Sequence, residues 1–171
     1  MKLNLKKFYR GKKIFITGHT GFKGSWLVAT LLKLGAKVTG FSLNDEKRKD
    51  YEKFLNFKRI KNIYADVGNY KRLRNEIKKT KPDIVFHLAA QPLVADSYTN
   101  PLKTFNTNFT GSINIFEITR ELKIKSVVVI TSDKCYLNKE IFRGYRESDQ
   151  LGGKDPYSAS KASVEIAFES Y

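Results

Sequence analysis

A tyrosine and a lysine four residues apart, Tyr157 and Lys161, are the side chains of this sequence whose spacing most directly suggests catalysis. Asp155 and Pro156 just before them are typical of a helix start, as cap and first helical residue. Residues i and i+4 share one face of a helix, so the ammonium group would stabilise a phenolate, as would the positive end of the helix. Such a tyrosine could take the proton of an alcohol while hydride leaves the same carbon atom.

The spacing alone is weak evidence, because a tyrosine four residues before a lysine is a common pair. The chain contains a second one, Tyr9 and Lys13, ahead of the first expected strand, where no site is expected. The alternative for Tyr157 and Lys161 is an ordinary exposed pair on a helix. The pair gains its weight from the elements around it, above all from a glycine-rich segment near the N-terminus.

Three glycines in the pattern G-x-x-G-x-x-G form a candidate phosphate loop between Gly18 and Gly24. Gly18 permits a tight turn after a strand, Gly21 lets the backbone approach a pyrophosphate, and Gly24 allows a helix to pack closely on the strand. The following helix would offer free N–H groups and a positive dipole to an anion. His19 could donate a further hydrogen bond to phosphate. The alternative is a glycine-rich turn without a ligand.

One polar position bears on which dinucleotide such a loop would hold. Ser42 stands at the end of the second expected strand, where an acidic residue would bind the adenosine ribose and exclude a 2′-phosphate. Lys47 and Arg48 follow closely. NAD and NADP therefore both remain open.

The elements that must hold these residues alternate between strand and helix. Short runs rich in Val and Ile, separated by helical patterns, indicate a parallel sheet covered on both faces. The expected strands are Lys13–Thr17, Lys37–Leu43, Asn62–Ala65, Asp83–Leu88 and Ser126–Thr131. The expected helices are Phe22–Leu34, Tyr70–Lys79, Pro101–Leu122 and Pro156–Tyr171.

These elements predict an α/β fold with a Rossmann-like doubly wound parallel sheet of about five strands, in one domain over residues 1–171. Two stretches fall outside the regular pattern. We expect Asn44–Arg59 to be a charged loop with a short helix, and Asn138–Gly153 to be polar and rich in turns. Phe22 and Trp26, at helical spacing, are expected in the core, and His87 is expected to be structural.

Composition excludes several other classes of protein. The chain has 171 residues, 41% of them hydrophobic, which is enough for one sizeable core, and no apolar run is long enough to cross a bilayer. Cys135 has no partner in the sequence, which fits a reducing cytosol. No His, Cys, Asp and Glu cluster has metal-ligand spacing, so no metal is expected. The net charge of +15 suggests nucleic-acid binding, but the basic residues are scattered and no aromatic platform accompanies them, so no nucleic-acid partner is expected.

The form of the glycine loop and the place of the Tyr-Lys pair after the fifth expected strand resemble the extended short-chain dehydrogenase/reductase family. The resemblance implies bound NAD, a catalytic pair of Tyr157 and Lys161 with the lysine also on the nicotinamide ribose, and a third hydroxyl from Ser132. It places Asp66 against the adenine amino group, where the alternative is a simple acid at a helix start. The implied cofactor-binding residues are Gly18, His19, Thr20, Gly21, Phe22, Lys23, Gly24, Ser42, Asp66, Val67, Leu88, Ala89, Ala90, Gln91, Asn108, Tyr157 and Lys161.

Four segments in combination resemble the CDP-glucose 4,6-dehydratases, a branch of that family. They are Thr17–Leu27, Ala89–Val94, Thr131–Tyr136 and Leu151–Ser158. Related dehydratases carry Thr-Asp-Glu in the third segment, with the Asp as general acid and the Glu as general base. Here Asp133 takes the acid's place and Lys134 the base's place, as is typical of this branch. Ala95 departs from the pattern, because an arginine that could hold a phosphate is expected there.

The chemistry implied by this resemblance is a transient oxidation. Hydride passes from C4 of the glucose ring to NAD while Tyr157 takes the 4-hydroxyl proton. Water then leaves across C5 and C6, with Asp133 protonating the departing oxygen, and hydride returns to C6. The product is CDP-4-dehydro-6-deoxyglucose. Lys134 would remove the C5 proton if neutral or polarise the ketone if charged, and the sequence does not choose between them.

The resembled enzymes continue for roughly as many residues again. The resemblance therefore implies the N-terminal part of an enzyme, without the small domain that holds the nucleotide of the substrate. It also implies CDP-glucose as the substrate, a homodimer and a cytoplasmic location. The alternatives are another epimerase or dehydratase of the extended family, or a non-catalytic dinucleotide-binding fragment.

Overall fold

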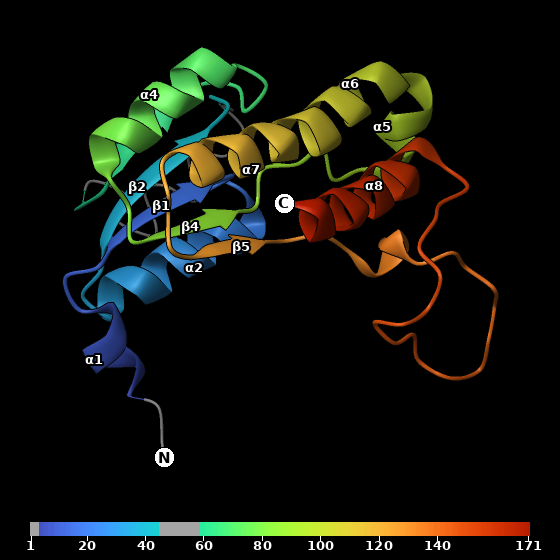
Figure 1. Ribbon diagram of the computed structural model, residues 1–171, viewed down its shortest axis with the longest axis horizontal. Coiled ribbons are helices and arrows are strands. Elements are labelled where there is room, and N and C mark those ends of the chain that lie inside the picture. The colour runs from blue at the N-terminus through green and yellow to red at the C-terminus, as the bar shows by residue number, and fades with distance from the viewer. Residues whose placement is uncertain (1–3, 45–58) are drawn as a thin grey trace.

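A five-stranded sheet forms the centre of the computed structural model, which describes residues 4–44 and 59–171 (Figure 1). All neighbouring strands pair in parallel, in the order β3-β2-β1-β4-β5. The strands are β1 (Lys13–Thr17), β2 (Lys37–Ser42), β3 (Lys61–Tyr64), β4 (Ile84–His87) and β5 (Val127–Val129). The order reverses between β1 and β4, as in a doubly wound Rossmann-like sheet, so the expected fold class is confirmed.

Helices cover both faces of this sheet (Figure 1). They are α1 (Leu5–Tyr9), α2 (Phe22–Lys33), α4 (Tyr70–Thr80), α5 (Val94–Thr99), α6 (Pro101–Phe105), α7 (Gly111–Glu121) and α8 (Pro156–Ser170). A π-helical turn, η3 (Asn106–Thr110), joins α6 to α7, and a short 3₁₀ turn, η4 (Asp133–Cys135), follows β5.

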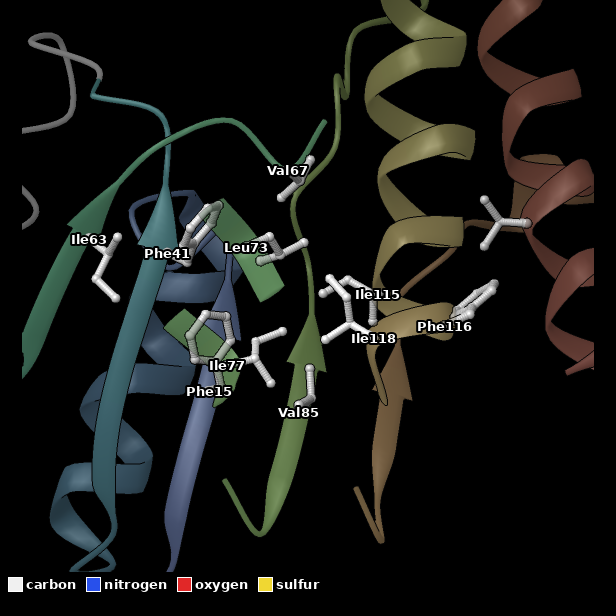
Figure 2. Packing of buried hydrophobic residues seen from close by; sticks show 11 residues of the cluster. Phe15, Phe41, Ile63, Val67, Leu73, Ile77, Val85, Ile115, Phe116 and Ile118 are labelled. Carbon is white, nitrogen blue, oxygen red and sulfur yellow. The ribbon is translucent and has the colours of Figure 1, made fainter. Parts of the chain in front are cut away.

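Strand β1 shows why the sheet is buried on both sides. Phe15 points to the face covered by α4, α7 and α8, where it packs in the cluster that Figure 2 shows. Ile14 and Ile16 point to the opposite face and pack with Val28 and Leu31 of α2. Side chains alternate along a strand with a period of two, so a strand covered on both faces is apolar throughout.

The expected strands are all present and differ from the structure only at their ends. The largest difference concerns the fifth strand, which was expected over Ser126–Thr131 and is observed over Val127–Val129. The chain then turns into η4 after Ile130, whose N–H still donates to the carbonyl of His87 at 3.0 Å. Thr131 thereby leaves the sheet at its carboxyl edge.

The expected helix over Pro101–Leu122 is divided into α6, η3 and α7. The backbone stays helical throughout, with φ of −62° at Asn106 and −59° at Gly111, so the path of the chain is continuous. The π-helical turn takes one more residue than an α-helical turn, which the apolar spacing did not reveal. The short helices α1 and α5 were also not predicted, because so few residues carry little periodicity.

The sequence-based assignment of Phe22 and Trp26 to the core is wrong. Their side chains are 68% and 53% exposed. Helix α2 instead presents Gly24, Ser25 and Val28 to the interior, with Leu31 one turn further on. Gly24 packs directly on the backbone of Gly18, and this close approach fixes the rotation of the helix and turns both aromatic rings outward.

One predicted region cannot be compared. The charged stretch Asn44–Arg59, with Lys47 and Arg48, lies outside the described residues except at its two ends. Across residues 4–44 and 59–171, the structure contains no helix with the length and apolar character needed to span a membrane.

Candidate active site

A cavity of about 600 Å³ opens at the carboxyl edge of the sheet, where the strand order reverses between β1 and β4. Ligands of open parallel sheets bind at this place, and the volume is typical of a small-molecule site. The cavity is lined by Gly18, Thr20, Gly21, Phe22, Lys23, Gly24, Ser42, Leu43, Asn44, Ala65, Asp66, Val67, Leu88, Ala89, Ala90, Pro92, Thr107, Ile130, Thr131, Tyr157 and Lys161.

The glycine loop forms one wall of the cavity and needs its glycines. Gly18 has φ of +73°, and a Cβ there would lie 2.7 Å from the backbone nitrogen of Ala89. A Cβ on Gly24 would collide with the carbonyl oxygen of Gly18. Gly21 precedes α2, and no side chain caps the first turn of that helix. The N–H groups of that turn can therefore bind an anion, so the loop fits the pyrophosphate of a dinucleotide.

The opposite wall is supplied by the start of α8. Asp155 caps this helix, because its carboxylate accepts from the backbone N–H of Ser158 at 2.9 Å and from the Ser158 hydroxyl at 2.6 Å. Pro156 is the first helical residue, as predicted. Tyr157 and Lys161 follow on one face, are 9% and 6% exposed, and both line the cavity. The structure thus brings the Tyr-Lys pair and the glycine loop into one site.

Lys161 is a buried cation with a strongly altered proton affinity. Burial lowers the pKa of Lys161 to about 8; the nearby charge of Lys23 acts in the same direction, and the Glu165 carboxylate opposes both. The Lys161 ammonium donates to the carbonyl oxygen of Ile130 at 3.4 Å. An ammonium group held here could bind ribose hydroxyls and stabilise a phenolate on Tyr157.

Asn108 lies in η3 and connects the loop after β4 to α8. Its side chain accepts from the backbone N–H of Gln91 at 2.8 Å and donates to the Ser160 hydroxyl at 2.9 Å. The Ser160 hydroxyl in turn donates to the carbonyl of Tyr157 at 2.7 Å. Asn108 is 1% exposed and does not itself line the cavity, so its side chain lies inside the fold. Asn108 therefore connects the loop after β4 to helix α8, and both of these supply residues to the cavity wall.

The Gln91 side chain is used inside its own loop. Its amide donates to the Leu93 carbonyl at 3.0 Å and to the Thr104 hydroxyl at 2.9 Å, and its oxygen accepts from the Leu93 N–H. Gln91 is not among the residues of the cavity wall. In this conformation its side chain supports the loop. Its contact with cofactor or substrate stays a prediction.

The prediction that the His19 side chain donates to phosphate is wrong. The ring is fully buried, with Nδ1 3.1 Å from the Ser42 hydroxyl and Nε2 2.9 Å from Oδ1 of the Asn62 side chain. Gly40 makes room for the ring, because a Cβ at that position would collide with it. His19 therefore organises the ends of β2 and β3, and both of its ring nitrogens are engaged away from the phosphate loop.

His87 is structural, as predicted. Its ring is 2% exposed and lies between the Thr17 hydroxyl, 2.6 Å from Nδ1, and the Ser112 hydroxyl, 3.0 Å from Nε2. Burial and the charge of Lys161 lower the pKa of His87 to about 3, so the ring is neutral at physiological pH.

The three residues expected after β5 lie in and before η4, beside the cavity but not in its wall. The Ser132 hydroxyl donates to the Asp133 carboxylate at 3.0 Å and accepts from the Lys134 N–H at 3.2 Å. Asp133 and Lys134 are exposed. Burial raises the pKa of Asp155, but hydrogen bonds from Ser158 and the charge of Lys134 outweigh burial and lower it. Lys134 thus lies near the start of α8.

Sequence reasoning missed several residues of the cavity wall. They are Leu43, Asn44, Ala65, Pro92, Thr107, Ile130 and Thr131. Most of them follow a strand directly, and the carboxyl end of each parallel strand is itself the signal that could have found them. Thr107 carried no such signal, because it reaches the cavity through the π-helical turn. In the part of the chain that the structure describes, no group of His, Cys, Asp and Glu side chains could hold a metal ion.

Comparison with known proteins agrees with this geometry. A family model described as GDP-mannose 4,6 dehydratase matches residues 15–171. Over 168 residues the chain is 44% identical to the CDP-glucose 4,6-dehydratase of Salmonella typhimurium. The aligned region covers 97% of this chain and 47% of that enzyme. The chain thus spans about half the length of the curated relatives it matches.

Solved structures show the same fold. The UDP-N-acetylglucosamine 4-epimerase of Methanobrevibacter ruminantium M1 matches with a TM-score of 0.81 at 28% identity, over 94% of this chain and 50% of that one. The UDP-glucose 4-epimerase of Brucella ovis, solved in complex with NAD, matches with a TM-score of 0.81 at 20% identity, over 94% of this chain and 48% of that one.

Proposed function

The chain belongs to the GDP-mannose 4,6-dehydratase family, and from that premise we propose that it forms the cofactor-binding and catalytic part of a CDP-glucose 4,6-dehydratase. The observation that carries the proposal is the meeting of Tyr157 and Lys161 with the glycine loop around one cavity. The 44% identity to the Salmonella typhimurium enzyme supports the choice of CDP-glucose as substrate.

The proposed cofactor is NAD. The glycine loop and the open first turn of α2 would hold its pyrophosphate, Asp66 would face the adenine, and Lys161 would contact the nicotinamide ribose. Ser42 would meet the adenosine ribose. Its hydroxyl is already bonded to the Thr20 hydroxyl at 2.9 Å and to His19, so the neutral oxygen suits a ribose hydroxyl better than a 2′-phosphate.

Bound NAD would accept a hydride and later return it. The Lys161 ammonium would stabilise Tyr157 as a phenolate, and this phenolate would take the proton of the sugar 4-hydroxyl. Ser132 would supply a hydroxyl to the reacting oxygen, and Asp133 would protonate the departing C6 oxygen, which leaves as water. Lys134 would act at C5 as the base or would polarise the ketone as a cation. Asp133 and Lys134 would have to turn toward the cavity once substrate is bound.

The remaining parts of the proposal concern the whole enzyme. Because this chain is about half as long as its curated relatives, we propose that a further domain holds the nucleotide of the sugar nucleotide. We also propose a homodimer in the cytoplasm. Cys135, free and buried, is compatible with such a reducing compartment.

Two measurements test the proposal. NADH binding, followed by fluorescence titration, should saturate, with NADPH binding more weakly. Incubation of the full-length protein with NAD and CDP-glucose, followed by mass spectrometry of the sugar nucleotide, should give a product lighter by one water. Failure of both dinucleotides to bind would overturn the cofactor site. Conversion of another sugar nucleotide but not of CDP-glucose would overturn the assignment of CDP-glucose as the substrate.

A second candidate is an epimerase of the same family, which would oxidise a sugar hydroxyl without removing water. The observation that favours it is the exclusion of Asp133 and Lys134 from the cavity wall, while Tyr157 and Lys161 lie in it. An Asp133→Asn variant separates the two reactions. Loss of a dehydrated product would support the dehydratase, and an epimerised product from the wild-type protein would support the epimerase.

A further inference from the structure

Helix α8 is attached to the segment after β5 by two neighbouring hydrogen bonds. The Lys161 ammonium donates to the carbonyl of Ile130, and the Thr131 hydroxyl donates to the Glu165 carboxylate. Ile130 and Thr131 are consecutive, and both line the cavity. Two adjacent residues of the cavity wall are therefore bonded to two side chains that lie one helical turn apart.

Glu165 continues the face of α8 that carries the Tyr-Lys pair. Tyr157, Lys161 and Glu165 are spaced by four residues each, so they lie one above the other along the helix. Glu165 is half-buried and lies behind the cavity wall rather than in it. Among the described residues, the ion pairs within 4 Å do not include Glu165.

The charged and titratable groups that face Lys161 come from three elements. Among the described residues they are Lys23 of α2, His87 of β4, and Tyr157 and Glu165 of α8 itself. His87 is neutral at physiological pH. Burial and Lys23 lower the pKa of Lys161, and Glu165 is the group that raises it. The balance is a value of about 8, so a further fall of about one unit would leave Lys161 about half neutral at pH 7.

Glu165 also faces the residues of η4 and its end. Burial comes first and Glu165 second among the causes that raise the pKa of the Cys135 thiol. Burial, Cys135 and carboxylates that include Glu165 raise the pKa of Tyr136. Both groups therefore stay neutral at physiological pH. They do not compete with Lys161 for the charge of Glu165.

We propose that Glu165 is a positioning residue, which holds α8 against the end of β5 through Thr131 and places a carboxylate behind Lys161, so that the ammonium stays charged at the cavity wall. The inference rests on the proposed function, in which this ammonium binds the cofactor ribose and stabilises the Tyr157 phenolate. It goes beyond that function because it assigns a role to a residue outside the cavity wall.

The sign of the effect follows from charge. Without the Glu165 carboxylate, burial and Lys23 act on Lys161 unopposed, so the pKa of Lys161 falls below about 8. Less ammonium is then present at neutral pH. As the pH is raised, the affinity for the cofactor should therefore begin to fall at a lower pH in such a variant than in the wild-type protein.

The test measures the protonation of Lys161 directly, without cofactor. Lysines acetylate only in the neutral form, so the rate of Lys161 acetylation between roughly pH 6 and 10, followed by peptide mass spectrometry, reports its apparent pKa. Glu165→Gln keeps the shape and removes the charge, and Thr131→Val removes the hydrogen-bond donor. Glu169→Gln is the matched control, because Glu169 lies one turn further along α8 and is exposed.

We expect the apparent pKa of Lys161 to fall by about one unit in Glu165→Gln, a tenfold change in proton affinity. We expect a smaller fall in Thr131→Val and none in Glu169→Gln. An unchanged value in both Glu165→Gln and Thr131→Val would overturn the proposal, even if NADH binding weakened. If circular dichroism shows that Glu165→Gln is unfolded, Thr131→Val decides alone.

NADH titration of the same samples keeps the two proposals apart. A wild-type protein that does not bind NADH contradicts the proposed function, while its Lys161 acetylation still tests the role of Glu165. A wild-type protein that binds NADH, with an unchanged Lys161 in both variants, contradicts only the role of Glu165.

Discussion

Tyr157 and Lys161 are polar groups that the fold takes out of water, and burial lowers the pKa of Lys161 to about 8. An ammonium group loses hydration when it is buried, so it holds its proton less tightly. The four-residue spacing predicted that these two side chains share a face, since helix geometry fixes that relation. The burial of His19 was not predictable, because it depends on the space that Gly40 leaves on a neighbouring strand.

The hydroxyl of Tyr157 is the group that the proposed chemistry depends on most. Tyr157→Phe removes it and leaves the aromatic ring in the cavity wall. We expect NADH affinity to change by no more than about twofold, and the rate of CDP-glucose conversion to fall by roughly 10²- to 10⁴-fold, as for loss of a general base. Fluorescence titration and timed mass spectrometry give the two values. A variant that converts CDP-glucose at the wild-type rate would contradict the role of Tyr157.

His87 should make the protein sensitive to acid. Its pKa is lowered to about 3 in the folded state, whereas an unfolded histidine titrates near 6.5, so below about pH 6.5 the unfolded state binds the proton first. Stability is therefore full above that pH and falls as the pH drops toward the folded value, by about 1.4 kcal/mol per pH unit. Urea unfolding between roughly pH 5 and 7 measures the slope. His87→Gln should show a shallower slope, and equal slopes would contradict the assignment.

At the scale of elements, helix termini position the site. Helix α8 begins at a full set of local signals, with a carboxylate cap and a proline at its first position, and the sequence predicted this start correctly. Helix α2 begins without a side-chain cap, which leaves N–H groups for a ligand. The π-helical turn that brings Thr107 and Asn108 to the site was missed, because its extra residue is stabilised by tertiary contacts and leaves no local sequence pattern.

Loss of the α8 cap should destabilise the helix that carries the catalytic pair. Asp155→Ala removes the acceptor of two hydrogen bonds from Ser158, and we expect a cost of about 1 kcal/mol in the free energy of unfolding. Urea denaturation followed by circular dichroism measures it. Glu169→Ala, on an exposed position of the same helix, serves as the control and should stay within about 0.5 kcal/mol of the wild-type protein.

At the scale of the whole molecule, the sheet was predictable in its strands, its parallel direction and its doubly wound order, because buried parallel strands are continuous apolar runs. The orientation of α2 was not, since the contact of Gly24 with Gly18 overrides the apolar spacing that placed Phe22 and Trp26 inside. The net charge of +15 is high for a chain of this length, and its basic side chains repel one another.

This repulsion should make thermal stability depend on salt. Raising NaCl from about 10 mM to about 0.3 M shortens the screening length to a few ångströms, so we expect Tm to rise by a few degrees. Differential scanning fluorimetry measures Tm, and an uncharged osmolyte at matched osmolarity is the control. A Tm that stays constant or falls with NaCl would contradict the idea that like charges dominate the surface.

The uncapped first turn of α2 has a practical consequence for the choice of buffer. Because Gly21 offers no side-chain cap, the N–H groups of the first helical turn stay open, and Lys23 belongs to that turn, so any small oxyanion in the solution is a competitor for the same place. Sulfate or inorganic phosphate should therefore raise the apparent dissociation constant of NADH and protect the protein against heat. Chloride has a single charge and no oxygen atoms arranged to accept several N–H groups, so it should do neither to the same degree, and Kd values taken in phosphate-buffered and in Tris-chloride solutions are not interchangeable.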